Sequence, residues 1–359
     1  MKDSVISRKI TRQIHVGDIP VGGGAPIPVQ SMTNTDTHDA EATLRQIRAL
    51  EEAGCDIVRL AVPDVAAADT FRYLKTHGVH IPLVADIHFN YEIALAAVAA
   101  GADKIRINPG NIGERAHTEA VVRACRERGI PIRIGVNTGS LEPRLLEKYG
   151  RPTAEALAES AMGHIRILEE LVFVDIAVSV KASDVSMMIV ANRILSRMTD
   201  YPLHLGVTEA GARYAAAVKS AVGIGTLLAE GIGDTVRVSL TEDPVHEIAA
   251  ARQILRTLGL DSRPGMDIVS CPTCGRTKIN LIRMAETFER RAAEEHLTDK
   301  PLKVALMGCV VNGPGEAREA DIGIAGGKGE GLLFKKGKIV RKIPESELID
   351  ALIEEIRHM

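Results

Sequence analysis

The chain has 359 residues, 45% hydrophobic and 25% charged, which is long enough for two domains of an ordinary globular protein. Its formal net charge of −3 excludes a general attraction to nucleic acid or to an anionic membrane surface. The first residues, MKDSVISRKI, contain no signal-peptide core and no run of about 18 apolar residues follows, so we expect a cytoplasmic protein without membrane spans.

A β-branched run, a loop and a helical stretch alternate from Pro28 to about residue 260. The predicted strands are Pro28–Met32, Asp56–Val62, Pro82–Ile87, Asp103–Asn108, Ile132–Asn137, Asp175–Val180, Pro202–Val207 and Thr235–Leu240. Amphipathic segments such as Ala40–Ala53, Tyr91–Ala100 and Ala154–Leu171 lie between them. Strands that alternate with helices run parallel, so eight units over about 250 residues predict a (β/α)8 barrel of the TIM type. A doubly wound open sheet is the alternative, but its early Gly-rich dinucleotide turn is missing.

A short segment before the first strand, TRQIHVGDIPVGGGAP, predicts a hairpin that closes the lower mouth of the barrel. The linker-like sequence LDSRPGMD then separates residues 1–262 from residues 263–359. The later part predicts a helix over Arg276–His296, strands at LKVALM, DIGIAGG, GLLFKK and GKIVRK, and a C-terminal helix after Pro344. We therefore expect the barrel to be followed by a small α+β domain.

Cationic side chains interrupt the apolar strands toward their C-terminal ends, where barrels of this type carry their active sites. Because residues two apart share one face of a strand, five cations are expected inside the barrel: Arg59, Arg106, Arg133, Lys181 and Arg237. Asp86 and Glu209 are the obvious acids near them, too few to neutralise the ring. Buried guanidinium groups need anionic partners, and their geometry matches phosphate oxygens. The pattern predicts a diphosphate site, with a self-neutralised interior as the alternative.

Other polar residues at the expected barrel mouth are candidate substrate ligands: His88, Asn108, Asn137, His204, Thr208 and Ser239. Asp86 and Glu209 are candidates for proton transfer, because a carboxylate near an open mouth can donate or accept protons. For Glu209 a simple ion pair with an arginine remains open. For His88 and His204 a packing role remains open.

Three of the five cysteines lie in the second part of the chain: Cys271 and Cys274 in SCPTCGR, and Cys309 in MGCVVNGPGE. A Cys-x-x-Cys pair can be half a zinc site, a redox pair or two ligands of an iron–sulfur cluster. Zinc would need a fourth ligand such as His296, and the βαβ context of a thioredoxin-type pair is missing. Three thiolates and the oxygen of Glu316 fit a [4Fe–4S] cluster. Its iron without a thiolate could exchange its ligand, so the cluster could be both electron source and Lewis acid.

The remaining two thiols, Cys55 and Cys125, lie at an apolar strand entry and in a helix, so we expect them in the core. Two other classes of function stay open on the residues alone. One is a metal-independent barrel lyase or aldolase with structural zinc in its second domain. The other is a non-catalytic binding module, which would have no use for five inward cations.

The two cysteine motifs, in this domain order, resemble the bacterial 4-hydroxy-3-methylbut-2-en-1-yl diphosphate synthase family. The barrel segments PVQSMTNTDT, VRLAVP, ADIHFN, KIRINPGN, RIGVNTGSL, VSVKAS and GVTEAG carry the same resemblance, which extends from about Arg8 to the C-terminal helix. It implies the compact two-domain form of the family, a TIM-type barrel followed by a sulfite-reductase-like iron–sulfur domain. It also implies a homodimer in which the cluster domain of one chain closes over the barrel of the other.

The resemblance implies a reaction and a role for individual residues. The substrate would be 2-C-methyl-D-erythritol 2,4-cyclodiphosphate, reduced by two electrons with loss of water in the non-mevalonate isoprenoid pathway. The electrons would come singly from a flavodoxin or a ferredoxin. The family's cluster ligands fall on Cys271, Cys274, Cys309 and Glu316. Its diphosphate-holding groups fall on Arg59, Arg106, Arg133, Asn137, Lys181 and Ser239, with Glu209 as proton donor.

Overall fold

The computed structural model of the chain describes residues 6–309 and 317–359. It divides into two compact units, Met1–Asp261 and Ser262–Met359. Each unit has its own cluster of buried apolar side chains, so each has an independent core.

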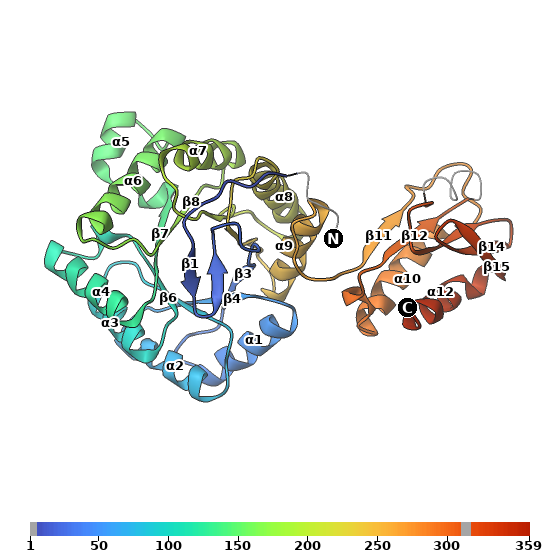
Figure 1. Cartoon of the computed structure of the whole chain (residues 1–359), viewed down its shortest axis with the longest axis horizontal. Coiled ribbons are helices and arrows are strands. Elements are labelled where there is room, and N and C mark those ends of the chain that lie inside the picture. Colours follow the sequence, from blue (N-terminus) through green and yellow to red (C-terminus); the bar gives the residue numbers. More distant parts are fainter. Residues whose placement is uncertain (1–5, 310–316) are drawn as a thin grey trace. The chain divides into compact units, whose positions relative to one another are not determined.

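Eight parallel strands form the barrel of the first unit (Figure 1). They are β3 (Gln30–Met32), β4 (Ile57–Ala61), β5 (Leu83–Asp86), β6 (Lys104–Ile107), β7 (Ile132–Asn137), β8 (Ile176–Lys181), β9 (His204–Leu205) and β10 (Thr235–Val236). Strands β3 to β8 pair in sequence order, and β9 pairs with β10. Single bridges, Val178 with Leu203 and Val29 with Val236, connect the two sheets on both sides. The predicted barrel is confirmed.

Nine helices in the described part of this unit surround the strands (Figure 1). They are α1 (Ala40–Glu52), α2 (Val65–Thr76), α3 (Tyr91–Ala100), α4 (Arg115–Arg128), α5 (Pro143–Tyr149), α6 (Ala154–Glu170), α7 (Val185–Met198), α8 (Arg213–Ala229) and α9 (Val245–Thr257). Helix α1 begins after Asp39, whose side chain accepts a hydrogen bond from the N–H of Ala42 at 2.9 Å. Its buried Leu44, Ile47 and Leu50 follow the helical period and face the barrel core.

The hairpin before the barrel closes the end where the strands begin. Strands β1 (Ile14–Val16) and β2 (Ile19–Val21) pair antiparallel. Their buried Ile14, Val16 and Val21 pack with inward residues near the start of three barrel strands: Ile57, Val84 and Ala177. The predicted plug is therefore confirmed, because the apolar side chains of the hairpin pack against the barrel at the end where the strands begin.

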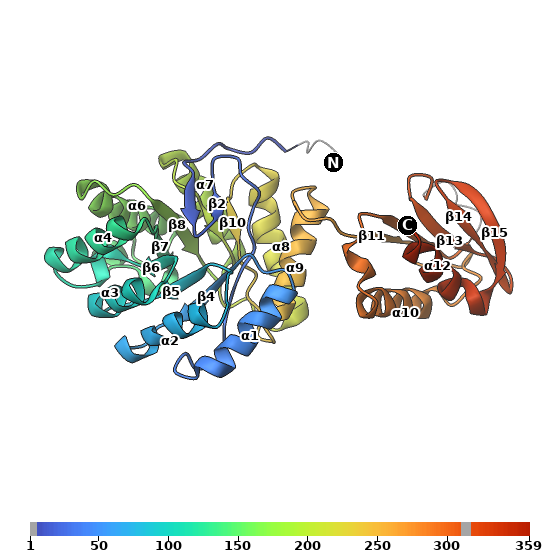
Figure 2. The ribbon, with the colours of Figure 1, turned by 60° about the horizontal axis from the view of Figure 1, so that its bottom comes forward.

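The second unit is a five-stranded mixed sheet with two helices on one face (Figure 2). Its strands, in spatial order, are β11 (Asp267–Ser270), β12 (Lys303–Met307), β13 (Ile322–Gly326), β14 (Glu330–Lys335) and β15 (Lys338–Pro344). The first three run parallel, and the last two are antiparallel to their neighbours. Helices α10 (Leu281–Glu294) and α12 (Leu348–Arg357) share one apolar core with β12 and β13.

Two details of this unit differ from the prediction. Strand β11 was not predicted, because a four-residue strand with exposed or half-buried side chains has no apolar pattern. The predicted helix from Arg276 begins only at Leu281, because the side chain of Asn280 caps it by accepting from the N–H of Arg283 at 3.3 Å. Among the described segments, no helix combines the length and apolar character needed to cross a lipid bilayer.

Candidate active site

A cavity of about 140 Å³ lies at the carboxyl ends of the barrel strands. Its walls are Arg59, Asp86, His88, Arg106, Arg133, Gly135, Val136, Asn137, Ser179, Lys181, Thr208, Arg237 and Ser239. The five cations expected inside the barrel therefore lie around one space, and we call Arg59, Arg106, Arg133, Lys181 and Arg237 the cationic ring. Polar groups that converge at this end of a TIM-type barrel are typical of an active site.

Asp86, at the end of β5, balances part of the charge of the cationic ring. Its Oδ1 accepts a hydrogen bond from Arg106 at 3.2 Å, and its Oδ2 lies 3.7 Å from Nε of Arg59. A ring nitrogen of His88 lies 3.0 Å from the same Arg106 guanidinium. Burial raises the pKa of Asp86, but the neighbouring guanidinium groups lower it further, to about 2. Asp86 is therefore ionised at neutral pH.

A second acid, which the sequence analysis missed, enters the barrel from α9. Glu247 is 2% exposed and accepts two hydrogen bonds from Arg237, at 3.0 and 3.2 Å. The hydroxyl of Ser31 and the N–H of Leu240 also donate to it, at 2.7 and 3.1 Å. The cationic ring thus has one more acid than expected, and Glu247 is the partner of Arg237. The sequence signal that could have identified Glu247 is a carboxylate on the face of a helix that is expected to be buried.

Two members of the cationic ring lack an acidic partner. Arg133 is 1% exposed, and its Nε and Nη2 have no hydrogen-bond partner in the described parts of the chain. Lys181 is also buried, and no ion pair or hydrogen bond joins it to another described residue. Burial lowers the pKa of both groups. Unpaired buried cations are costly, so this arrangement favours binding of an anion.

Two glycines make room for the cationic ring. A Cβ on Gly135 would lie 2.2 Å from Nε of Arg106, and Nη2 of the same arginine donates to the Gly135 carbonyl at 2.6 Å. A Cβ on Gly206 would lie 2.8 Å from Nζ of Lys181. Any larger residue at either position would displace a cation from the cavity.

Three of the candidate site residues do not line the cavity. Asn108 is buried and accepts a hydrogen bond from the N–H of Gly135 at 2.9 Å, so it holds the strand beside Arg106. His204 is fully buried, and its Nδ1 lies 3.4 Å from the Thr235 hydroxyl. Glu209 is exposed and has a φ of 52°, a left-handed conformation that is rare outside glycine.

Replacement of Asp86 by Asn is expected to destabilise the barrel at neutral pH by about 3–5 kcal/mol, because two buried guanidinium groups lose their counter-ion. The folded-state pKa of about 2 lies below the ordinary value of about 4. The stabilisation is therefore complete above about pH 4 and disappears as the pH falls toward 2. Urea unfolding of wild type and variant at pH 7 and pH 3 measures this difference. The exposed Asp69→Asn change is the control, and a pH-independent difference would contradict the assignment.

Two of the three thiols of the second unit lie where two adjacent parallel strands end. Strands β11 and β12 are parallel, so Cys271 and Cys309 leave the sheet at the same edge. The N–H of Gly308 donates to the Cys271 sulfur at 3.3 Å. The Cys274 and Cys309 loops are joined by the N–H of Lys278, which donates to the Gly308 carbonyl at 3.0 Å. This parallel pairing, absent from the sequence prediction, brings the motifs together.

The chemistry of these thiols fits a cluster ligand set. Cys274 is exposed, and hydrogen bonds from Arg276 lower its pKa, which favours the thiolate that binds iron. No three His, Cys, Asp or Glu side chains in the described ranges gather closely enough for a single metal ion. Cysteine thiolates are the usual ligands of iron–sulfur clusters. Glu316, the fourth candidate ligand, lies outside the described residues, whereas Cys55 and Cys125 are buried in the barrel as predicted.

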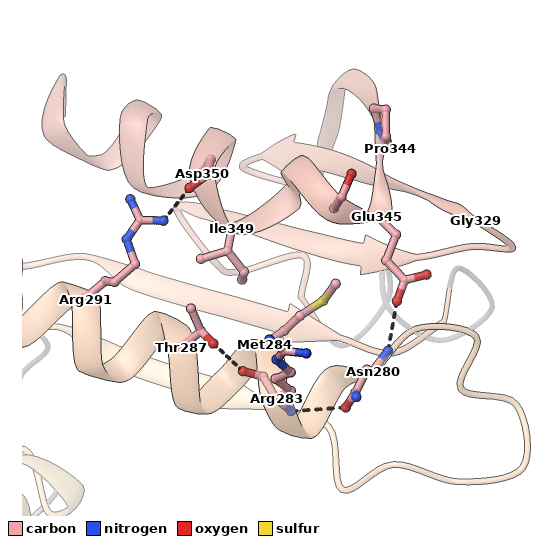
Figure 3. Close-up of a pocket in the computed structure, with 11 residues that line it drawn as sticks. Asn280, Arg283, Met284, Thr287, Arg291, Gly329, Pro344, Glu345, Ile349 and Asp350 are labelled. Carbon is pink, nitrogen blue, oxygen red and sulfur yellow. Dashed lines mark hydrogen bonds and ion pairs between the residues drawn. The ribbon is translucent and has the colours of Figure 1, made fainter.

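A separate groove of about 690 Å³ lies between α10 and α12 (Figure 3). It is larger than the cavity of the cationic ring, but it contains no thiol. The N–H of Asn280 donates to Glu345 at 3.1 Å, and Arg291 pairs with Asp350 across it. Its polar groups largely satisfy one another, so we do not assign the groove to the reaction.

Comparisons with known proteins give matches for both units of the chain. Residues 11–252 match the GcpE TIM-barrel domain, and residues 267–358 match the GcpE protein C-terminal domain. A relative from Geobacter sulfurreducens is 61% identical over 348 residues, 96% of this chain and 97% of that protein. One from Caldanaerobacter subterraneus is 59% identical over 352 residues, 98% of each chain. Both are named 4-hydroxy-3-methylbut-2-en-1-yl diphosphate synthase (flavodoxin).

Solved structures show similarity of fold only. A type I 3-dehydroquinate dehydratase from Clostridium difficile superimposes with a TM-score of 0.50 and 13% sequence identity. The match covers 70% of this chain and 98% of that chain, which is the extent of a single barrel. Such a distant match supports the barrel architecture and carries no information about the reaction.

Proposed function

This chain belongs to the GcpE family, and from that premise we propose how its two units share the reaction. The barrel would bind a cyclic diphosphate, and electrons from the C-terminal unit would open the ring of that substrate. It is an oxidoreductase of the non-mevalonate isoprenoid pathway. The reaction reduces 2-C-methyl-D-erythritol 2,4-cyclodiphosphate by two electrons, with loss of water, to (E)-4-hydroxy-3-methylbut-2-enyl diphosphate.

The observation that carries the proposal is the unpaired charge of the cationic ring. Arg133 and Lys181 are buried without an acidic partner in the described structure, and both line the cavity. Two phosphate groups would provide their missing partners, and guanidinium forks suit phosphate oxygens. Arg59 and Arg106 would contribute further bonds, whereas Arg237 is oriented by Glu247.

The remaining polar groups of the cavity would orient the substrate. Asn137, Thr208 and Ser239 line it and can donate hydrogen bonds to phosphate or hydroxyl oxygens. His88 would bind from the open side, where its side chain is 58% exposed. We propose that His204 and Asn108 support the residues that line the cavity, because neither of them lines it.

A [4Fe–4S] cluster held by Cys271, Cys274, Cys309 and Glu316 would supply single electrons and a Lewis-acidic iron. The chain's own contribution there is to hold the thiolates and to direct the Gly308 N–H at the Cys271 sulfur. Such hydrogen bonds to sulfur tune the reduction potential of a cluster. The thiols must stay reduced to serve as ligands, so the proposal places the enzyme in the cytoplasm.

Proton transfer is assigned to Glu209. Its exposed side chain is held on a left-handed residue next to Thr208 of the cavity wall, so a modest movement could bring it to the substrate. Asp86 is less suited to donate a proton, because its pKa of about 2 keeps it ionised. Its proposed role is to orient Arg106 and Arg59.

The proposal includes two kinds of protein partner. Relatives named for flavodoxin indicate a flavodoxin as electron donor, with a ferredoxin as the related possibility. Electrons on the C-terminal unit must reach a substrate in a barrel. A homodimer in which the cluster domain of one chain closes over the barrel of the other would meet this requirement and exclude water from the reaction.

The decisive experiment is anaerobic purification followed by assay. The protein is expected to be brown, to contain iron and sulfide, and to convert the cyclic diphosphate to the linear one when reduced flavodoxin is supplied. Phosphorus NMR follows the product directly. A colourless protein that contains only zinc and gives no linear product would contradict the proposed function.

A further inference from the structure

Beneath the cationic ring lies a second set of polar side chains that the proposed reaction does not use. We call Gln30, Lys104 and His204 the inner layer; all three are 0% exposed. Lys104 lies two residues before Arg106 on β6, so its side chain points into the barrel on the same face. Nζ of Lys104, Nε2 of His204 and both amide atoms of Gln30 lack hydrogen-bond partners within the described ranges.

The charged groups that interact with Lys104 in the described structure are cations. They are Arg133 of the neighbouring β7 and Arg59 of β4, and Lys104 in turn acts on His204 of β9. On the neighbouring β5, Val84 pairs with Lys104 and packs against the apolar side chains of the hairpin plug.

The acids of the barrel interior are already engaged in the cationic ring. Asp86 pairs with Arg59 and Arg106, and Glu247 pairs with Arg237. Burial, and then Arg133 and Arg59, lower the pKa of Lys104 well below its usual range. Without an anion in the cationic ring, burial among cations therefore favours the neutral form of this amine.

Occupation of the cationic ring changes this balance. The backbones of Lys104 and Arg106 lie about 7 Å apart along the strand, and charges interact more strongly inside a protein than in water. We propose that Lys104 is a positioning residue that takes up a proton when a diphosphate enters the cationic ring, and so supplies charge beneath the ligand. This inference rests on the proposed function. The linear product has one more ionisable phosphate oxygen than the cyclic substrate, so the extra cation would also help to hold the product.

Calorimetric titration tests the inference with the full chain, purified anaerobically and without reductant so that no turnover occurs. The cyclic diphosphate is the titrant, because each phosphorus has a single, strongly acidic oxygen that does not titrate near neutrality. Runs in buffers with different ionisation enthalpies count the protons taken up. The wild-type protein is expected to take up protons when the cyclic diphosphate binds. The Lys104→Met variant is expected to take up about one proton fewer and to bind the cyclic diphosphate roughly 10-fold more weakly.

Stability measurements provide a second readout, because the variant that binds the ligand more weakly should be the more stable protein without it. Removal of a buried, unpartnered amine is expected to raise the Tm of the unliganded Lys104→Met protein by about 2–4 °C. The exposed Lys148→Met change is the matched control, with unchanged proton uptake and affinity. If the Met variant does not fold, Lys104→Gln, which also cannot take up the proton, must show the same deficit.

The outcomes separate this inference from the function on which it rests. Equal proton uptake by wild type and the Lys104 variants would overturn the inference while leaving the enzyme assignment intact. A wild-type protein that does not bind the cyclic diphosphate would instead overturn the assignment of the cationic ring.

Discussion

Replacement of Arg133 by Met is expected to weaken binding of the cyclic diphosphate by about 10- to 150-fold, the effect of losing hydrogen bonds to a charged group. Arg133 is the ring member with the clearest need for a ligand, because two of its nitrogens lack partners in the described structure. Its loss leaves no buried acid unpaired, since Asp86 and Glu247 keep their other arginines. Folding should therefore be preserved or improved.

Equilibrium titration of the reductant-free protein with the cyclic diphosphate measures the Arg133 effect, and thermal unfolding checks the fold. Arg166→Met, a change of the same kind on the exposed side of α6, is the control and should bind like wild type. Unchanged affinity in a folded Arg133→Met protein would place the anion site elsewhere.

Replacement of Cys309 by Ser is expected to remove iron, sulfide and visible absorption and to reduce activity by at least about 1,000-fold, because two thiolates cannot retain the cluster. Binding of the cyclic diphosphate should stay within about 2-fold of wild type, because the barrel is a separate unit with its own core. Loss of catalysis with intact binding would assign substrate binding to the barrel and electron transfer to the C-terminal unit.

The matched control for this change is Cys125→Ala. Cys125 is buried in α4 of the barrel, where burial raises its pKa to about 12, so it is an inert thiol. Its variant should keep wild-type iron content, with at most a small loss of stability from the cavity. Strong residual activity in Cys309→Ser would defeat the cluster assignment.

Regular elements were predictable where the pattern is local. The strand at Ile132–Asn137 and the helix at Tyr91–Ala100 were predicted with the bounds that the structure has. Their β-branched runs and caps are properties of a few consecutive residues. Strand β11 was missed for two reasons. Its side chains are not buried, and its partner β12 begins at Lys303, 33 residues after β11 ends at Ser270.

The inward direction of the cations was also predictable, because alternation along a strand has a period of two. Which groups meet across the interior was not. Glu247 follows Arg237 by ten residues, yet only the packing of α9 against β3 and β10 makes it the partner of that arginine. His204 was a candidate substrate ligand, but it is the first residue of β9, so it lies in the inner layer and does not line the cavity.

By itself the sequence determined the order of the elements, the supply of positive charge and the three thiols of the second domain, because these depend on residue identity and short spacing. Only the tertiary structure decided which charges pair with one another and that Nζ of Lys104 is buried with no partner among the described residues. Those relations join residues that are far apart in the chain, and closure of the barrel alone sets the distances between them.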